Sequence, residues 1–339
     1  MSLNKKIVSL LLVLLVIIGA GPIQQYLRDD LTLVGEFQFA EDIDHFVFYS
    51  PHQDDESIFF SQTVQAAIDK VGSDRVTVVL LSDGAASGAQ ELPEIAQPLD
   101  AVTSTVQQLL IQSSAAPLTQ EEIADAKRLL FSKARTNEFI AALEALGVGH
   151  YELHTLPDGD LAGSIEEINS IIRGKLGTEG RVAHLTYSYY FDPHADHCAT
   201  GQALQEISAE DGFGDHNTAY FMVKMEPATL ANYYPQPIFY KKAHFRLLQQ
   251  QTGSQQIAAA AAEYGVRCTD MDAATQQIAA ALYDTMQRDG CTLLQAIETT
   301  SAVSTLRLGV GHLSVKDFFT MTDAHLTNQS LVTLIHTPF

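Results

Sequence analysis

Apolar and polar positions alternate along residues 45–225 in a way that predicts strands and helices in turn. Short apolar runs predict buried strands, and longer segments with helical spacing lie between them. Strands that alternate with helices form parallel sheets. The pattern predicts an α/β fold, a Rossmann-like, largely parallel sheet with helices on both faces. The predicted strands are 45–50, 75–81, 151–156, 182–190 and 220–225, and the predicted helices begin near 56 and cover 123–146, 164–176 and 200–208.

Two regions depart from this alternation. Residues 85–121 are small, polar and Gln-rich, and three prolines interrupt them, which predicts an inserted loop beside the sheet. After Pro227, Pro235 and Pro237 the chain becomes rich in Ala, Gln and Leu, with helical periodicity over 238–300. We expect residues 226–339 to form a mostly helical C-terminal extension of a catalytic domain at 45–225.

The first 25 residues have a composition of their own. Lys5 and Lys6 precede the apolar stretch 7–20, the plan of a signal peptide or an N-terminal membrane anchor. The stretch is 14 residues long, or 17 if it extends to Ile23, which is at the short limit for crossing a bilayer. A buried core helix is the structural alternative. We expect an exported protein, either secreted or membrane-anchored outside the cytoplasm through residues 7–23, with a polar lead-in at 26–44.

Charge and cysteine content limit the partners and the covalent framework. Asp and Glu number 41 against 20 Lys and Arg, and the net charge of -21 argues against nucleic acid as a partner. Three cysteines are too few for a disulfide framework. Cys268 and Cys291 could pair in an exported protein. Cys198 directly follows His197 and is either a metal ligand or a small buried thiol.

Two polar clusters follow predicted strands and carry the candidate chemistry. The first is His52-Gln53-Asp54-Asp55 after strand 45–50, and the second is Asp192-Pro193-His194-Ala195-Asp196-His197 after strand 182–190. Loops at the carboxyl ends of parallel strands form the ligand crevice of an open sheet. We therefore expect the two clusters to lie together although about 140 residues separate them.

The residue types in these clusters suit a hydrolytic metal centre. Two imidazoles and one carboxylate bind Zn²⁺ and leave positions open for water and substrate, and His52, Asp55 and His197 would supply them. Other divalent ions accept the same ligands. Taken separately, the pieces have ordinary explanations. Adjacent aspartates before a helix are common N-cap residues, and two histidines three positions apart can simply hydrogen-bond within a loop.

The remaining acidic and imidazole groups would carry out the proton transfers. Asp54 cannot easily bind the same ion as Asp55, but it can accept a proton from an attacking water as a general base. His194, as an imidazolium, could stabilise the oxyanion or protonate the departing amine. Asp196 could hold that ring in its charged form.

At these residues the chain resembles the PIG-L (LmbE-like) family of zinc-dependent N-acetylglucosaminyl de-N-acetylases. The motifs of that family are P/A-H-P-D-D-E and H-P-D-H, and Gln53 and Ala195 replace a proline in each. The resemblance implies Zn²⁺ on the same three ligands, with Asp54 as the base.

The resemblance extends to the segment Arg135-Thr136-Asn137-Glu138 and to Leu156-Pro157-Asp158-Gly159, and it covers roughly residues 45–225. It implies that Arg135 and Asp158 hold sugar hydroxyls, and we place Asp192 with them as a substrate-binding residue. A helix-surface ion pair and an ordinary Asp-Gly turn are the structural alternatives for Arg135 and Asp158.

The function that these observations favour is metal-dependent hydrolysis of an N-acetyl amide on an amino sugar or glycoconjugate, which releases acetate and a free amine. One alternative is a catalytically silent carbohydrate-binding or cell-envelope protein that retains the metal site. Another is a non-haem iron oxygenase, which uses two histidines and a carboxylate but is usually built on an all-β scaffold. The alternating pattern argues against the oxygenase.

Overall fold

The computed structural model describes residues 39–189, 192, 194–225, 244–250, 271–314 and 331–337. The predicted signal or anchor at 1–25, most of the lead-in at 26–44, and Cys268 lie outside these residues. Cys198 and Cys291 are free thiols. No helix in the described part of the chain is long and apolar enough to span a bilayer.

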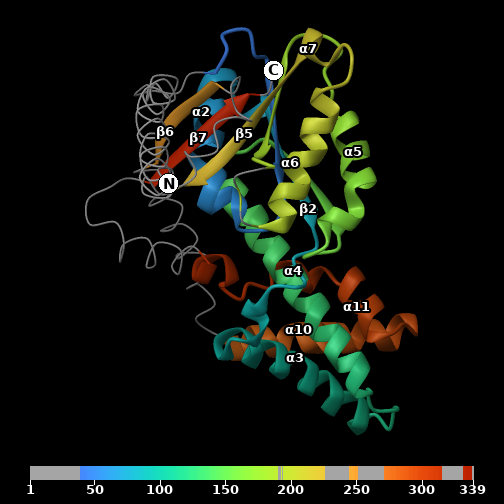
Figure 1. The fold of residues 1–339 in the computed structure, drawn as a ribbon. Helices are drawn as coiled ribbons and strands as arrows, with labels where there is room; N and C mark the ends of the chain where they lie inside the picture. The colour runs from blue at the N-terminus through green and yellow to red at the C-terminus, as the bar shows by residue number, and fades with distance from the viewer. Residues whose placement is uncertain are drawn as a thin grey trace, which may run out of the picture.

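The described strands form a seven-stranded sheet in the order β3-β2-β1-β4-β5-β7-β6 (Figure 1). The first five strands in this order pair in parallel, which confirms the predicted α/β fold. The last two add antiparallel pairs, since β7 pairs with β5 and β6 pairs with β7. The strands are β1 His45–Ser50, β2 Val76–Ser82, β3 His150–Leu156, β4 Val182–Tyr187, β5 Asn217–Met225, β6 His244–Gln250 and β7 Leu331–Thr337.

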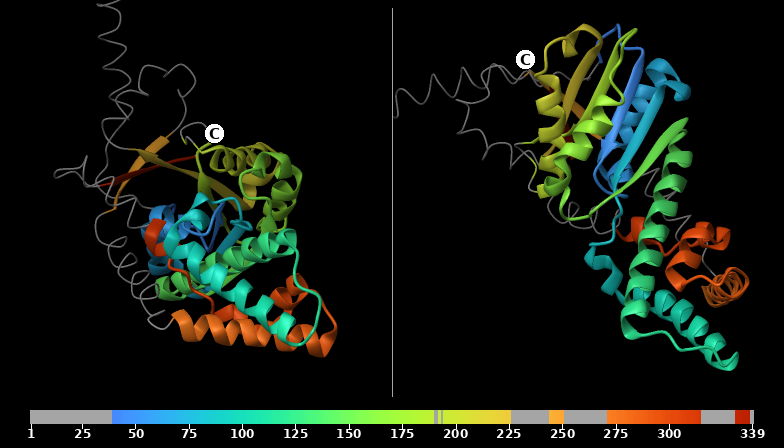
Figure 2. Two further views of the ribbon diagram at one scale, coloured as in Figure 1. Left: turned by 90° about the horizontal axis from the view of Figure 1, so that it is seen from below. Right: turned by 90° about the vertical axis from the view of Figure 1, so that its right-hand side faces the viewer.

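Helices cover both faces of the parallel part of the sheet, as Figure 2 shows. Alternate residues of β1 point to opposite faces. Phe46 and Phe48 pack against α2 (Ser61–Val71) and the second half of α4 (Gln120–Leu146). Val47 and Tyr49 pack against α5 (Ile165–Arg173) and α6 (Ala195–Ser208). Burial on both faces explains why β1 and β2 are almost continuously apolar.

The prediction of an inserted loop at 85–121 is wrong, because most of that segment is the helix α3 (Pro93–Gln112). Pro93 occupies the first turn, where its missing N–H costs nothing. Pro98 lies inside the helix and removes one backbone hydrogen bond. The buried residues of α3 compensate for that loss because they form a stripe with helical spacing, Ile95, Leu99, Val102, Val106 and Leu110.

The C-terminal region is helical in part. Helices α10 (Met271–Asp289) and α11 (Leu293–Thr299) and the 3-10 helix η6 (Ser301–Thr305) agree with the predicted extension. The strands β6 and β7 do not, and β6 lies inside the segment 238–300 that was predicted to be helical. A short apolar run does not distinguish helix from strand by itself. The edge of β5 favours a strand at β7, because it offers backbone groups that β7 can pair with.

A second hydrophobic core joins the helices that lie beside the sheet. It is formed by α3, the first half of α4, α10, α11 and the segment 303–310 (Figures 1 and 2). Helix α4 begins at a capping box between Thr119 and Glu122, ends at Gly147 in the left-handed conformation, and runs through both cores. Its middle therefore lies where the two cores meet.

Candidate metal centre

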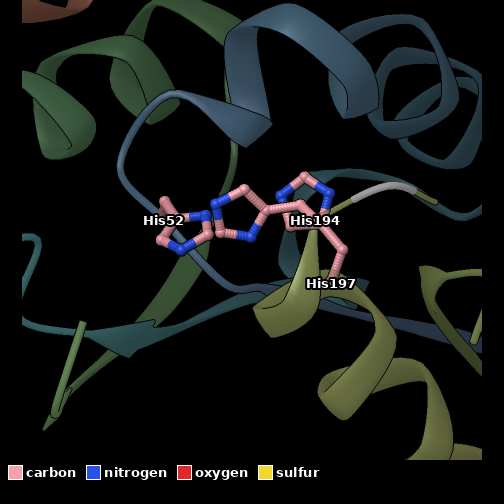
Figure 3. A group of neighbouring side chains, drawn as sticks. All are labelled: His52, His194 and His197. Carbon is pink, nitrogen blue, oxygen red and sulfur yellow. The ribbon is translucent and has the colours of Figure 1, made fainter. Parts of the chain in front are cut away.

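The two polar clusters lie at the switch point of the sheet. The chain builds β1, β2 and β3 outward in one direction and then crosses to β4 and β5 on the other side of β1. In open α/β sheets, ligands bind at such a switch point, beside the carboxyl ends of the strands. His52 follows β1, and His194 and His197 follow β4, so the topology itself brings them together. Figure 3 shows the three imidazoles side by side.

Asp55 lies between the two imidazoles that were predicted to bind metal. Its Oδ2 is 3.4 Å from Nδ1 of His52, and its Oδ1 is 3.4 Å from Nε2 of His197. The centroids of the two rings are 5.3 Å apart. All three side chains are buried. The structure thus brings together the residues that the sequence predicted as ligands.

The other nitrogen of each imidazole faces a second carboxylate. Nε2 of His52 is 3.1 Å from Oδ2 of Asp196, and Nδ1 of His197 is 3.0 Å from Oδ1 of Asp192. The five residues form a chain in which acids and imidazoles alternate. Metal-binding histidines usually have such an acidic partner, because it fixes the ring and leaves the opposite nitrogen as a ligand. The donor set therefore fits a divalent cation.

The position of Asp192 differs from that expected of a substrate-binding residue, although its predicted role stays untested. The carboxylate was expected to bind substrate, but its Oδ1 accepts the backbone N–H of His194 at 2.9 Å and approaches the ring of His197. Only 6 % of its side chain is exposed. Asp192 therefore contacts a predicted ligand, a contact that its place between a strand and a helix did not reveal.

Mutual contacts determine the charges of the metal-free cluster. Burial disfavours the charged form of His52, but hydrogen bonds with Asp196 and Asp55 outweigh it and raise the pKa of His52 to about 10. Burial also disfavours the charged form of His197. Asp55 and Asp192 outweigh this effect and raise the pKa of His197 to about 9. Burial alone would raise the pKa of Asp55, yet the two imidazoles hold it well below its usual range. In the metal-free protein both imidazoles are therefore protonated, and metal binding must displace these protons.

His197 lies within a helix rather than in the predicted loop. Helix α6 begins at Ala195, five residues before the predicted start at 200, and His197 is in its first turn. His194 is the N-cap residue, and its Nδ1 accepts the backbone N–H of Asp196 at 3.3 Å. Helices begin readily where a side chain can accept one of the first N–H groups, and here an imidazole does so.

The contacts of His194 and Asp196 differ from those expected. The carboxylate of Asp196 accepts the backbone N–H groups of Gly159 at 2.8 Å and Leu161 at 3.1 Å and contacts His52, so it does not hold His194 charged. Burial, followed by repulsion from His197 and His52, lowers the pKa of His194. His194 is therefore a neutral, exposed imidazole, and the expected imidazolium is not supported.

Asp54 lies beside Arg135 and Asp158. Nη2 of Arg135 is 3.5 Å from Oδ2 of Asp54, and Nη1 is 3.9 Å from Oδ2 of Asp158. Nη1 also donates to the carbonyl oxygen of Gly84 at 3.2 Å. Arg135 and Asp158 are buried, whereas 23 % of the Asp54 side chain is exposed. The arginine therefore forms part of the candidate site and is not a surface ion pair on its helix.

Neither aspartate of the first motif caps the following helix with its side chain. A short π-helix, η1 (Glu56–Phe60), follows Asp55, which makes no capping hydrogen bond there. Oδ2 of Asp55 instead accepts the backbone N–H of His52 at 2.9 Å. Short π-helical segments are frequent at functional sites. The capping explanation of this motif is therefore not supported.

The described residues offer two further groups of candidate ligand atoms. Ring nitrogens of His52, His194 and His197 all lie within 4.8 Å of one another, as do atoms of His52, Asp158 and Asp196. The second group is less suited to a cation, because Asp196 already accepts two backbone N–H groups. The first group makes His194 an alternative to Asp55 as the third ligand.

A comparison with protein-family models supplies the family. The PIG-L model, described as GlcNAc-PI de-N-acetylase, matches residues 47–208. This range contains most of β1, all of β2 to β4, and both polar clusters. Residues 47–208 of the chain therefore match the PIG-L family. The resemblance seen in the sequence is confirmed, and helices α10 and α11 lie outside the matched PIG-L region.

The solved structures that match this chain share little sequence with it. The A40926 pseudoaglycone deacetylase Dbv21 is 18% identical, with 88% of this chain and 97% of that chain covered and a TM-score of 0.40. The N,N'-diacetylchitobiose deacetylase of Pyrococcus horikoshii is 15% identical, with 74% and 88% covered and a TM-score of 0.37. GalB, a 4-carboxy-2-hydroxymuconate hydratase of Pseudomonas putida KT2440, is 14% identical, with 88% and 97% covered and a TM-score of 0.39. No curated protein sequence matches the chain.

The two departures from the PIG-L motifs lie away from the predicted ligand atoms. The side chain of Gln53 is buried, and its Nε2 donates to the carbonyl oxygen of Ser82 at 3.0 Å. A Cβ at Gly84 would lie 2.2 Å from Oε1 of Gln53, so the glutamine fills the space that this glycine leaves. Ala195 is exposed at the start of α6.

Two residues of the candidate site were not predicted from the sequence. Tyr187, treated there as a core or stacking aromatic, donates a hydrogen bond to Asp55. Asp83, at the end of β2, accepts the backbone N–H groups of Ala85 at 3.0 Å and Asp158 at 3.3 Å. It thereby ties the loops after β2 and β3 together. The position of Asp83 directly after a buried strand was the available signal.

Proposed function

We propose that this protein is a metal-dependent hydrolase that removes an acetyl group from an N-acetylated amino sugar, releasing acetate and a free amine. The observation that carries the proposal is the alternating chain of carboxylates and imidazoles in which Asp55 faces one nitrogen of His52 and one of His197. The match of residues 47–208 to a family model described as a de-N-acetylase supports the same reaction.

His52, Asp55 and His197 would hold the cation, with Zn²⁺ as the proposed metal. When bound there, it would polarise the amide carbonyl and make a water molecule more acidic. Asp192 and Asp196 fix the two rings from behind. Tyr187 and the backbone of His52 orient the Asp55 carboxylate. The ligands would therefore be held in place before a substrate binds.

Asp54 is the proposed general base. Its carboxylate is partly exposed, while that of Asp55 is buried, so two adjacent acids have different access to water. In the proposed reaction Asp54 removes a proton from the water that attacks the amide carbon. It then delivers this proton to the nitrogen as the C–N bond breaks, so the amine leaves in its neutral form. Arg135 keeps the carboxylate beside the cluster.

His194 is the proposed donor to the amide oxygen. Its Nδ1 accepts a backbone N–H group, which leaves the proton of the neutral ring on Nε2. An N–H group near the carbonyl can donate to the oxygen as negative charge develops on it. A neutral imidazole fulfils this role without a proton transfer. This assignment replaces the imidazolium expected from the sequence.

The proposed substrate surface includes Arg135 and Asp158. Arg135 lies next to Asp54 and Asp158, and Oδ1 of Asp158 is 3.4 Å from Nε2 of His52. An arginine and an aspartate together offer donors and an acceptor to neighbouring hydroxyls, as a sugar requires. The sequence of residues 7–23 further supports export, and fractionation of cells that produce the full chain would test this part of the proposal.

The test is acetate release by the full-length protein with its metal content measured. A panel of N-acetylglucosamine derivatives, free, oligomeric and lipid-linked, would be incubated with zinc-loaded and chelator-treated protein. We expect acetate and amine in equal amounts from at least one derivative, and loss of the activity after chelation. Binding of a glycan without acetate release from any derivative would contradict the proposal and favour the catalytically silent alternative.

A further inference from the structure

The middle of helix α4, residues 132–138, contacts both the candidate site and the C-terminal region. Ser132 and Arg135 donate to the carbonyl oxygens of Asp83 and Gly84, in the loop that follows β2. Asn137 and Glu138 instead contact the segment 303–311, which lies more than 160 residues later in the sequence. Seven residues of one helix thus connect two distant parts of the chain.

The contacts with segment 303–311 are made with its backbone. Nδ2 of Asn137 donates to the carbonyl oxygens of Val303 at 2.8 Å and Leu306 at 3.1 Å. The carboxylate of Glu138 accepts three N–H groups, from Leu308, Gly309 and Gly311, each at 2.7 Å. Buried backbone groups require a partner, so these two side chains satisfy five groups that would otherwise be unpaired.

The two hydrophobic cores meet along the same helix. Toward its N-terminal end α4 contributes Leu130, Phe131 and Ala134 to the helical core, which also contains Val303, Leu308 and Val310. Toward its C-terminal end α4 contributes Phe139 and Leu143 to the core beneath the sheet. Because α4 belongs to both cores, it is a route by which the position of the helical core can affect the site.

We propose that segment 303–311 positions Arg135 in the candidate site, acting through Asn137 and Glu138 on helix α4. Arg135 in turn holds the carboxylates of Asp54 and Asp158. The C-terminal helices, which lie outside the region matched by the family model, thereby become part of the catalytic apparatus. Asn137 and Glu138 are positioning residues because neither touches the cluster.

The decisive variant is Glu138→Gln, which keeps the shape of the side chain but cannot accept all three N–H groups. Its matched control is Glu144→Gln, an exposed position on the same helix with the same change of charge. If Glu138→Gln fails to fold, Asn137→Ala removes the two other contacts and takes its place.

The first readout, hydrogen exchange of the metal-loaded protein, requires no enzymatic activity. The amide of Ala86 donates to Oδ2 of Asp158 at 2.8 Å, so its exchange reports on the loop that Arg135 holds. We expect severalfold faster exchange across residues 83–86 in Glu138→Gln, no change across α5, and no change in Glu144→Gln. Unchanged exchange at 83–86 in a folded variant would overturn the proposal.

The second readout rests on the proposed function. We expect kcat/KM for acetate release to fall about tenfold in Glu138→Gln, mainly through KM, with the metal content unchanged. In an Arg135→Met background the same substitution should have no further effect on kcat/KM but should lower the melting temperature as before. Equal losses of kcat/KM in both backgrounds would show a merely structural role. If no substrate releases acetate, the proposed function fails, and the exchange result still decides the positioning role.

Discussion

The hydroxyl of Tyr187 donates a hydrogen bond of 2.7 Å to Oδ1 of Asp55. The Tyr187 ring also lies parallel to that of His197, with 3.8 Å between the centroids. One residue at the end of β4 therefore orients a carboxylate from the first cluster and an imidazole from the second. Its side chain is buried, so this contact is made inside the protein.

Replacing Tyr187 with Phe should weaken metal binding without unfolding the protein. The variant keeps the stacked ring and loses only the donor to Asp55. Loss of such an outer partner lowers metal affinity by roughly 10- to 100-fold. Competition with a chromophoric chelator would measure the change. Tyr151→Phe is the control, since Tyr151 is 41% exposed on β3. Equal affinities for the two variants would rule out this role for Tyr187.

The identity of the third ligand can be decided by two substitutions. If Asp55 is a ligand, Asp55→Ala should lose the metal, and His194→Ala should retain close to one equivalent. We expect this result because Asp55 faces the inner nitrogens of both His52 and His197, whereas His194 is exposed at the start of α6. Elemental analysis of the purified variants would measure it. The reverse pattern would establish the three-histidine group instead.

Replacing Asp54 with Asn should separate metal binding from turnover. The amide has nearly the shape of the carboxylate but cannot take a proton from water, so the rate should fall by at least about 100-fold. The metal content should stay unchanged. Asp69→Asn, at an exposed position on α2, controls for the loss of one negative charge. Near-normal acetate release by Asp54→Asn would show that another group is the base.

The stability of the metal-free protein should fall as the pH is raised above 7. In the folded state the pKa of His52 is about 10 and that of His197 about 9, against 6.5 for an ordinary histidine. A raised pKa stabilises the fold below pH 6.5, and this contribution is lost as the pH rises through 9 and 10. The slope is at most about 1.4 kcal/mol per pH unit for each group.

Urea denaturation in the presence of a chelator, at pH values from 7 to 10, would measure this loss. The variant with both His52→Gln and His197→Gln is the control, and its stability should change less over the same range. Metal affinity should change in the opposite direction and increase with pH, because the ligand nitrogens must be free of protons. A flat stability profile of the wild-type protein would contradict the assigned charges.

Substituting Gly201 with Ala should displace helix α6. A Cβ there would lie 2.4 Å from the carbonyl oxygen of Tyr187 and 2.7 Å from the backbone nitrogen of Tyr189, so the helix must move away from β4. We expect a loss of about 1–3 kcal/mol in the free energy of unfolding, together with weaker metal binding through His197. Gly214→Ala is the control, because nothing lies within 4 Å of a Cβ at that position. Equal stability of the two variants would exclude this close approach.

The sequence alone was sufficient to predict the parallel sheet and the proximity of His52, Asp55 and His197. Strands buried on both faces must be almost continuously apolar, so β1, β2 and β4 are evident from composition. The carboxyl ends of parallel strands meet at one edge, so residues that directly follow β1 and β4 had to be neighbours. The convergence of His52, Asp55 and His197 follows from these two rules.

Tertiary structure decided the features that depend on distant partners. Helix α3 tolerates Pro98 because its apolar stripe packs against α4 and α10, and β7 pairs with the free edge of β5. Asp192 contacts His197, and Asp196 contacts His52. Tyr187 donates a hydrogen bond to Asp55. Each contact depends on the tertiary position of the partner. The local sequence pattern predicts which face of a helix or strand is buried. The pairing of polar side chains depends on how the whole chain packs.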